Sequence, residues 1–187
     1  MAFGLLLIAA AGGLFAYNTV TDKKAGETAD GIVKEVEQAA DVSSYDEDEN
    51  GEVYAMIEGE KYIGVIAIPS VGIELPVQSE YSLAKLKIAP CRYYGSVPEG
   101  TAVICAHNYR SYFGNLKYAK PGDKVYFTDA AGLTYPYEIS LIEQLDGYDS
   151  ERMKENNGWD MTLFTCTYSG KQRITLRLTR TVEEDTE

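Results

Sequence analysis

The stretch WDMTLFTCTYSGKQRITLRLT, residues 159–179, is the part of the chain that says most about the fold. Its two ends, Trp159–Cys166 and Gln172–Thr179, are rich in apolar and β-branched residues, and a short connection with Ser and Gly separates them. This pattern predicts two strands that pair as an antiparallel hairpin. Cys166 ends the first strand and Arg173 begins the second, so hairpin pairing is expected to bring the two side chains together.

The second strand of this hairpin alternates between apolar and polar residues. Successive side chains of a strand point to opposite faces, so the alternation predicts one face toward a core and a polar face toward solvent. The polar face contains Arg173, Thr175, Arg177 and Thr179. We interpret Arg177 as an ordinary surface cation, which makes it the comparison for Arg173.

His107 is the one histidine of the chain, and it follows the apolar run Ala102–Ala106. In thiol-based acyl transfer a thiolate attacks a carbonyl, an imidazolium protonates the leaving amine and a fixed cation stabilises the oxyanion. Cys166, His107 and Arg173 suit these three roles, each at the border of a predicted strand. Each residue type alone is common in structural positions, so their joint occurrence is what indicates catalysis. No carboxylate is obviously placed to orient the imidazole, and neither a metal nor another cofactor is expected.

Strand signals dominate the chain from Val53 onward, with short apolar segments between turn residues. Eight or so short strands with few helices predict a mainly β domain, either a barrel or a sandwich. The further predicted strands are Tyr62–Ile68, Ile73–Val77, Ala102–Ala106, Lys124–Thr128 and Leu133–Ile142. Short helical segments are expected within 79–87, 108–120 and 150–154.

The first twenty residues carry no charged side chain and include Leu5–Ile8 and Leu14–Phe15. A helix of this length rises about 30 Å, which just spans the hydrocarbon core of a bilayer. We interpret residues 1–20 as a transmembrane signal anchor. A cleaved signal peptide fits less well, because no Lys or Arg precedes the apolar run and Phe15–Tyr17 make a poor cleavage site. A buried core helix is the third alternative, and the acidic stretch that follows does not favour it.

Acidic residues are concentrated outside the predicted β domain. Of the 29 acids and 17 bases, residues 22–60 hold 13 and 3, and residues 181–187 hold 4 and none. The central part is therefore nearly neutral and has no basic surface of the kind that binds nucleic acid. We divide the chain into the anchor, a helical and acidic linker at 21–52, the β domain at 53–181 and an acidic tail at 182–187. Within the linker, Thr28–Ala40 predicts an amphipathic helix.

The chain has three cysteines, and an odd, low number argues against a disulfide scaffold. A bridge between Cys91 and Cys105 is left open by the sequence. Cys105 lies within an apolar run, so we expect it to point into a core as a small hydrophobic residue.

The motifs around these residues resemble those of the sortases, cysteine transpeptidases of Gram-positive cell surfaces. Thr162–Cys166 resembles the TLxTC signature of this family, and Ala106–Asn108 resembles its histidine segment. Pro121–Val125 resembles a GD-x-V turn of the family, and Arg173 lies in the strand after the cysteine, as the family's essential arginine does. The resemblance extends over roughly 62–180, in the family's order and with its separations.

The resemblance implies an eight-stranded sortase-type β-barrel with short helices, placed outside the cell membrane behind an N-terminal transmembrane helix. It implies that Cys166, His107 and Arg173 cleave a sorting signal of the LPxTG kind through a thioacyl intermediate. The surface protein would then pass to an amine of a peptidoglycan precursor or of a pilin. Thr165 and Asn108 are the implied substrate-binding residues, and the loop 146–158 is the implied recognition loop.

The resemblance leaves the subclass and the reaction outcome open. The connection between Cys166 and Arg173 is short, and no aromatic lid of the pilin-polymerising kind precedes the predicted barrel. Both features favour housekeeping anchoring or a class B- or D-like role over pilus polymerisation. A cysteine peptidase that releases the same peptide to water would use the same three residues. A membrane-tethered binding barrel with an inert Cys166 is the third hypothesis. Lys23 and Lys24 favour a cytoplasmic position for that end of the anchor by the positive-inside rule, whereas the resemblance places the barrel outside.

Overall fold

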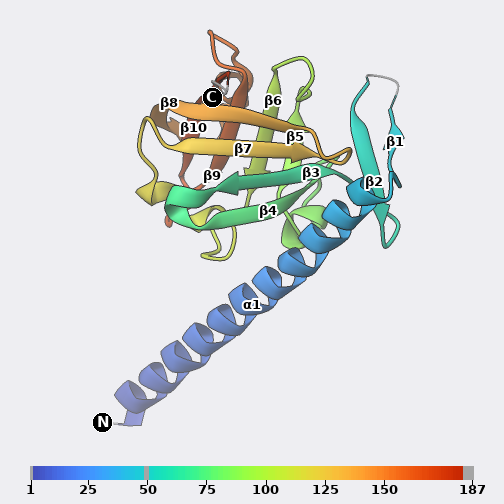
Figure 1. Ribbon diagram of the computed structural model, residues 1–187. Coiled ribbons are helices and arrows are strands. Elements are labelled where there is room, and N and C mark those ends of the chain that lie inside the picture. Colours follow the sequence, from blue (N-terminus) through green and yellow to red (C-terminus); the bar gives the residue numbers. More distant parts are fainter. Residues whose placement is uncertain (1, 49–50, 183–187) are drawn as a thin grey trace.

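The computed structural model of the chain describes residues 2–48 and 51–182, so the predicted tail lies almost wholly outside the described residues. Within them, a long N-terminal helix, α1 (Ala2–Asp41), precedes a β domain (Figure 1). The strands are β1 (Asp46–Glu47), β2 (Val53–Ile57), β3 (Glu60–Ile68), β4 (Ile73–Gln78), β5 (Cys91–Tyr94), β6 (Ala102–Ala106), β7 (Lys124–Asp129), β8 (Thr134–Asp146), β9 (Met161–Cys166) and β10 (Gln172–Arg180). The short helices are η1 (Pro69–Val71), η2 (Lys85–Lys87), η3 (Phe113–Tyr118) and α2 (Ser150–Lys154).

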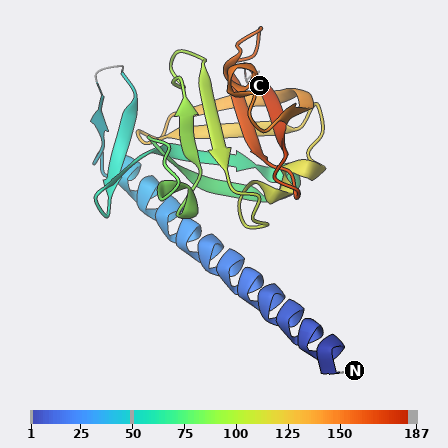
Figure 2. The same ribbon diagram turned by 180° about the vertical axis from the view of Figure 1, so that it is seen from behind.

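Eight of the strands close into a barrel, which confirms the predicted fold class and excludes the sandwich. The order around the wall is β3-β4-β5-β6-β9-β10-β8-β7, and β7 returns to pair with β3. Most neighbours are antiparallel, while β4 with β5 and β6 with β9 are parallel. β1 and β2 continue the sheet beyond the start of β3 as a ribbon beside the barrel (Figure 2). Closure pairs the sheet with itself and removes the exposed edges of an open sheet.

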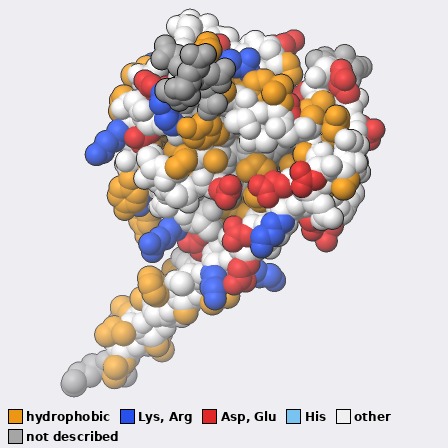
Figure 3. All heavy atoms as spheres, viewed as in Figure 1, with side chains coloured by type: hydrophobic (Ala, Val, Ile, Leu, Met, Phe, Trp, Pro, Cys, Tyr) orange, Lys and Arg blue, Asp and Glu red, His pale blue; other side chains and the backbone are white. Residues whose placement is uncertain are grey.

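α1 runs without a break from the apolar N-terminal segment to Asp41, so the predicted helix Thr28–Ala40 is the last part of a longer one. This last part packs on β2 and β3 through Ile32, Val33 and Val36, which lie on one face and are buried. The N-terminal half projects away from the barrel, and the side chains of residues 4–20 are exposed (Figure 3). Among the described residues, α1 is the one helix long and apolar enough to cross a membrane.

The acidic segment before the barrel contributes more structure than the sequence predicts. Asp46 and Glu47 form β1 and pair with β2. Glu52 is buried and forms an ion pair with Arg92 of β5. The division of the chain at residue 53 remains a prediction, but the segment before it is fastened to the barrel.

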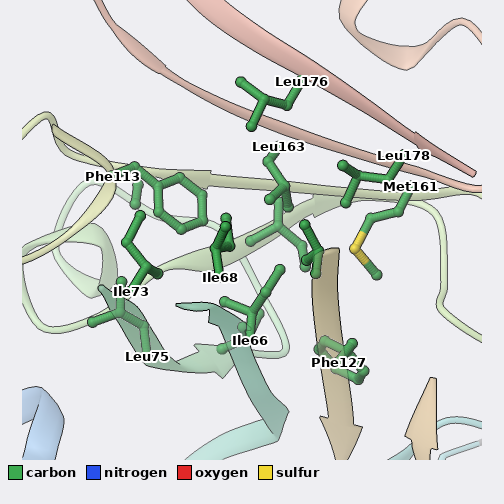
Figure 4. Packing of buried hydrophobic residues seen from close by; sticks show 14 of the residues in the cluster. Ile66, Ile68, Ile73, Leu75, Phe113, Phe127, Met161, Leu163, Leu176 and Leu178 are labelled. Carbon is green, nitrogen blue, oxygen red and sulfur yellow. The ribbon is translucent and has the colours of Figure 1, made fainter. Parts of the chain in front are cut away.

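Apolar side chains from all sides of the wall fill the barrel. Ile66 and Ile68 of β3 meet Phe127 of β7, Leu163 of β9 and Leu176 of β10 in one cluster (Figure 4). These residues alternate along their strands with residues that point outward, as the period of two requires. The packed interior holds β6, β9 and β10 in fixed positions relative to one another.

A second, smaller cluster lies on the outer face of the wall. Cys105 of β6 and Phe164 of β9 are buried there together with Leu86 from the β4–β5 connection and Met153 of α2. The three cysteines are free, although Cys91 and Cys105 are register partners on β5 and β6. Cys105 is buried as expected, in this outer cluster.

The interpretation of Arg177 as a surface cation is wrong. Its side chain is 0% exposed, and Thr175 beside it is also buried. The polar face of β10 is covered by the connection between β8 and β9, which contains α2. The alternation along the strand correctly separates two faces, but it carries no information about a segment that folds over the outer one.

Candidate active site

Three adjacent strands place His107, Cys166 and Arg173 in a row across the barrel wall. Ala106 pairs with Thr165 at the end of the parallel strands β6 and β9, so His107 and Cys166 follow at equivalent positions. Cys166 is the register partner of Arg173 in the antiparallel pair β9 and β10, which confirms the predicted hairpin. Neighbouring strands lie about 4.8 Å apart. The imidazole, the thiol and the guanidinium therefore emerge from consecutive positions along one line.

All three residues line one cavity of about 320 Å³ on the outside of the barrel. Its floor contains Phe164 and Cys105 of the outer cluster. The β4–β5 connection supplies one wall and the β8–β9 connection supplies the other. The remaining lining residues are Tyr81, Leu83, Leu86, Tyr93, Ala106, Gly147, Ser150, Met153 and Thr165.

One side of the cavity is an aromatic wall. The rings of Tyr81 and Tyr93 lie edge to face with centroids 5.3 Å apart, and Tyr93 meets Phe164 in the same way at 5.4 Å. Edge-to-face pairs of this kind are favourable and restrain each ring. The sequence did not reveal this wall, because its rings come from three separate segments and share no spacing.

His107 is half-buried at the end of β6, and its ring packs on that of Tyr109 with centroids 5.0 Å apart. Burial lowers the pKa of His107 below its usual range, and the positive charge of Lys87 adds to this effect. The protonated form is therefore scarcer near neutral pH than for a free imidazole. Among the described residues that line the cavity there is no carboxylate, so the imidazole has no acidic partner there.

Cys166 is the accessible thiol of the chain. It is partly exposed and lies in the cavity, whereas Cys91 and Cys105 are buried. Burial raises the pKa of Cys91 to about 12 and raises the pKa of Cys105 further. Since the thiolate is the nucleophile, the two buried cysteines are unsuited to attack.

Arg173 is held by its own hairpin. Its Nη1 donates to the carbonyl oxygens of Gly170 at 3.0 Å and Gln172 at 3.2 Å. Gly147 of the β8–β9 connection leaves room for the guanidinium, because a Cβ there would lie 3.0 Å from Nη1 and 2.8 Å from the carbonyl oxygen of Lys171. The guanidinium at the end of the row thus has a defined place, and its Nε and Nη2 have no hydrogen-bond partner among the described residues.

The structure places the other two predicted site residues at the junction of the strand ends. The hydroxyl of Thr165 donates to the carbonyl oxygen of Ala106 at 2.8 Å, and the side chain is 1% exposed. Nδ2 of the exposed Asn108 donates to the carbonyl oxygen of Thr167 at 3.4 Å. Both bonds tie the histidine strand to the cysteine strand, and a contact with substrate stays a prediction for each.

Arg177 fixes the β8–β9 connection to the barrel, a role that the sequence did not indicate. Its Nη1 donates to the carbonyl oxygen of Met153 at 3.1 Å and to Oγ1 of Thr162 at 2.9 Å. Its Nη2 donates to the carbonyl oxygen of Arg152 at 2.5 Å, and its Nε donates to Oε1 of Glu143 at 2.9 Å. Because Met153 and its neighbours line the cavity, Arg177 positions one wall of the site.

Asp22 of α1 contacts the loop that follows His107. Its carboxylate accepts the backbone N–H groups of Arg110 at 3.2 Å and Ser111 at 2.9 Å. Oγ of Ser111 donates in return to the carbonyl oxygen of Asp22 at 3.0 Å. The sequence placed Asp22 in the linker and gave no signal of this contact, since it joins residues almost ninety positions apart.

The comparisons with known proteins identify the family. The Sortase domain model matches residues 66–181, more than half of the chain. The chain therefore belongs to the sortase family, whose members are cell-surface cysteine transpeptidases. Sortase A of Bacillus anthracis is 27% identical over 132 residues, which are 67% of this chain and 62% of that protein. The chain thus spans less than two thirds of that relative.

Solved structures agree with the fold. A sortase C1 from Streptococcus suis is 26% identical, with a TM-score of 0.60, and the likeness covers 71% of this chain and 79% of that one. A pilus-related sortase C of Group B Streptococcus is 29% identical, with a TM-score of 0.59 and coverage of 68% and 71%. Sortase A from Corynebacterium diphtheriae covers 95% of this chain and 98% of its own, with a TM-score of 0.61, and at 18% identity it supports the fold alone.

Proposed function

We propose that this chain is a membrane-anchored transpeptidase that cleaves an LPxTG-like sorting signal and transfers the surface protein to an amine. The observation that carries the proposal is the row of His107, Cys166 and Arg173 in one cavity of a chain that belongs to the sortase family. The cavity is open to solvent at the thiol and has a chemically complete set of groups for acyl transfer.

The reaction proceeds in two steps on these three residues. The thiolate of Cys166 attacks the carbonyl carbon of the scissile amide, so that a C–S bond forms and the C–N bond breaks. The imidazolium of His107 gives its proton to the leaving amine, and Arg173 stabilises the negative charge on the oxygen. In the second step the acceptor amine attacks the thioester, the C–S bond breaks, and a proton returns to His107.

The proposed location follows from α1. Residues 1–20 act as a single transmembrane anchor, and the barrel lies on the extracellular side. The exposed, uncharged surface of the projecting half of the helix supports this arrangement (Figure 3). The acceptor is then an amine at the cell surface.

The proposal leaves two acceptors, an amine of a peptidoglycan precursor and a lysine of a pilin. Among the described residues, no segment before Tyr81 lines the cavity, which supports an open site and a class B- or D-like enzyme. The structural similarity to class C sortases, one of which is a pilus-related enzyme, favours the pilin lysine instead. The amine that enters the product distinguishes the two acceptors.

The test uses the full chain in lipid nanodiscs with an LPxTG-type peptide, with and without oligoglycine or a lysine-containing peptide, followed by mass spectrometry. A peptide–amine product and an adduct on Cys166 are expected, and Cys166→Ala should give neither. Hydrolysis that no amine alters would favour the cysteine peptidase. A Cys166 that forms no adduct and alkylates no faster than free cysteine would favour the inert barrel.

A further inference from the structure

We propose that the edge of the barrel at which the active site lies rests on an anionic lipid surface. This edge, the catalytic edge, consists of residues 20–24, 87–88, 107–112 and 167–173. The inference rests on the proposed function in one respect, because it takes α1 as the membrane anchor. The new claim is that this face of the barrel meets the membrane. The cavity would then open at the level of the lipid headgroups.

The end of the apolar segment and the loop after His107 lie at the same level of the molecule. The uncharged residues of α1 end where Asp22, Lys23 and Lys24 begin, and this is where a spanning helix leaves the hydrocarbon core. Asp22 is also the residue that accepts the backbone N–H groups of Arg110 and Ser111. At 1.5 Å per residue, Asp22 lies only about 3 Å along the axis from Val20. The helix therefore has no spacer that could hold this loop away from the lipid.

The other segments of the catalytic edge are joined to this loop. The hydroxyl of Tyr112 donates to the carbonyl oxygen of Ile88, and Nδ2 of Asn108 donates to the carbonyl oxygen of Thr167. The parallel strands β6 and β9 both end at this edge. In Figure 2 the free half of α1 projects on the side to which β6 points, and Figure 1 shows the same arrangement from the front. The membrane-facing side and the catalytic side of the barrel are thus one side.

The charge of the catalytic edge is opposite to that of the chain. It holds six of the 17 basic residues and one of the 29 acidic residues, although the chain has a net charge of −12; Asp146, the register partner of Gln172, is a second acid at its border. Both acids accept backbone N–H groups, Asp22 from Arg110 and Ser111 and Asp146 from Tyr148. The basic residues are Lys23, Lys24, Lys87, Arg110, Lys171 and Arg173. Basic residues close to a membrane are attracted to anionic headgroups.

Two exposed side chains of this edge suit a lipid interface. Tyr168, at the tip of the β9–β10 hairpin, is 103% exposed, and Ile88 is partly exposed beside Lys87. Tyrosine is enriched at membrane–water interfaces, because its ring is apolar and its hydroxyl is wet. An acidic protein could also bind these basic residues, but the anchor already places this surface beside lipid. Lys23 and Lys24 then act as headgroup contacts, which accounts for basic residues on the proposed outer side of the anchor.

The test measures how close two points of the barrel lie to lipid headgroups. Cys166→Ala provides the background, since Cys91 and Cys105 are buried and will not label. An environment-sensitive dye is attached to a cysteine introduced by Tyr168→Cys or, as the matched control, by Leu133→Cys. The labelled chain is placed in vesicles that contain anionic lipids and lipids with a nitroxide quencher on the headgroup. Leu133 is 59% exposed and lies in the β7–β8 turn, at the other end of the 13-residue strand β8. That strand is about 40 Å long at 3.3 Å per residue.

Quenching at position 168 is expected to exceed quenching at position 133 at least fivefold, and to decrease with salt or in vesicles of zwitterionic lipid alone. Equal quenching at both positions would overturn the proposal, and so would a chain that does not float with the vesicles. Insensitivity to salt and to lipid charge would overturn the anionic part. All measurements use a chain that cannot turn over, so failure here is distinct from a failure to cleave the sorting peptide.

Discussion

Replacement of Arg177 by Met should release one wall of the cavity without touching the reactive row. The side chain lies on the outer face of β10, and its four hydrogen bonds all go to groups outside the row. Met fills a similar volume and can pack against Trp159, whose ring now lies 4.5 Å from the guanidinium carbon. The change therefore tests the hydrogen bonds and the charge more than the packing.

The expected loss is about 3 kcal/mol or more, because several buried acceptors lose the same charged donor at once. The carbonyl oxygens of Arg152 and Met153 and the hydroxyl of Thr162 lose their donor, and each unsatisfied buried group costs about 1–3 kcal/mol. These costs do not add, because the connection can move outward and take up water. Glu143 contributes less to the loss, because its Oε2 still accepts a hydrogen bond from Nη2 of Arg152 at 2.8 Å.

Hydrogen exchange on the full chain in nanodiscs provides the assay. A loss of 3 kcal/mol corresponds to an increase of about 10²-fold in the opening equilibrium of the amides in 150–159. The KM for the sorting peptide should rise because Met153 no longer has a fixed position, while the alkylation rate of Cys166 should change less than about twofold. Arg177→Lys should fall between wild type and Arg177→Met, since it keeps the charge and loses the fork.

Arg152→Met is the matched control, because Arg152 binds the same Glu143 from an exposed position. Exposed ion pairs contribute about 0–1 kcal/mol, so this variant should be close to wild type. If Arg177→Met and Arg152→Met gave the same exchange in 150–159, burial of the guanidinium would not be what holds the connection, and the reasoning would be refuted.

Three further predictions concern the row itself. Arg173→Ala and His107→Ala should each lower kcat/KM about 10²-fold or more. Arg173→Lys should be more active than Arg173→Ala but less active than wild type. Full activity of Arg173→Lys would mean that the charge alone suffices. His107 gives the one imidazole signal in NMR, and its pKa should lie below about 6.5. Lys87→Gln should raise this pKa and so increase the imidazolium fraction near neutral pH. An unchanged pKa in this variant would show that Lys87 does not lower it. Gly147→Ala should lower kcat/KM about tenfold through a displaced Arg173, as overpacking by about 1–3 kcal/mol implies, whereas a fully active variant would show that the guanidinium can move freely.

The sequence predicted the elements whose signal is local. Patterns within ten or so residues predict the hairpin around Cys166, the apolar strand before His107 and most of the other strands, while closure into a barrel was implied by the family resemblance alone. The register pair of Cys166 with Arg173 follows from a short connection. The short strands β1, β2 and β5 were missed because they are polar, short or aromatic, and pairing with a neighbour decides their conformation. Of the segment 79–87 that looked helical, only η2 is helical.

The positioning residues could not be predicted, for a common physical reason. Arg177 and Asp22 have ordinary local contexts, a polar strand face and the start of an acidic segment. Their roles come from segments that arrive from elsewhere in the chain, the β8–β9 connection in one case and the loop after His107 in the other. A periodic pattern specifies which way a side chain points, but what covers it is a property of the tertiary structure.

The chemistry and the recognition of this site are supported by different parts of the molecule. The row depends on the register of three strands, which the buried Leu163 and Leu176 and the bond from Thr165 to the Ala106 carbonyl maintain from inside the barrel. The wall that we propose to face the peptide depends on a connection that one buried arginine fastens from outside. Substitutions in that connection can therefore change which peptide fits while the distances within the row stay the same. A sequence change in the connection that altered the alkylation rate of Cys166 as strongly as the KM would contradict this separation.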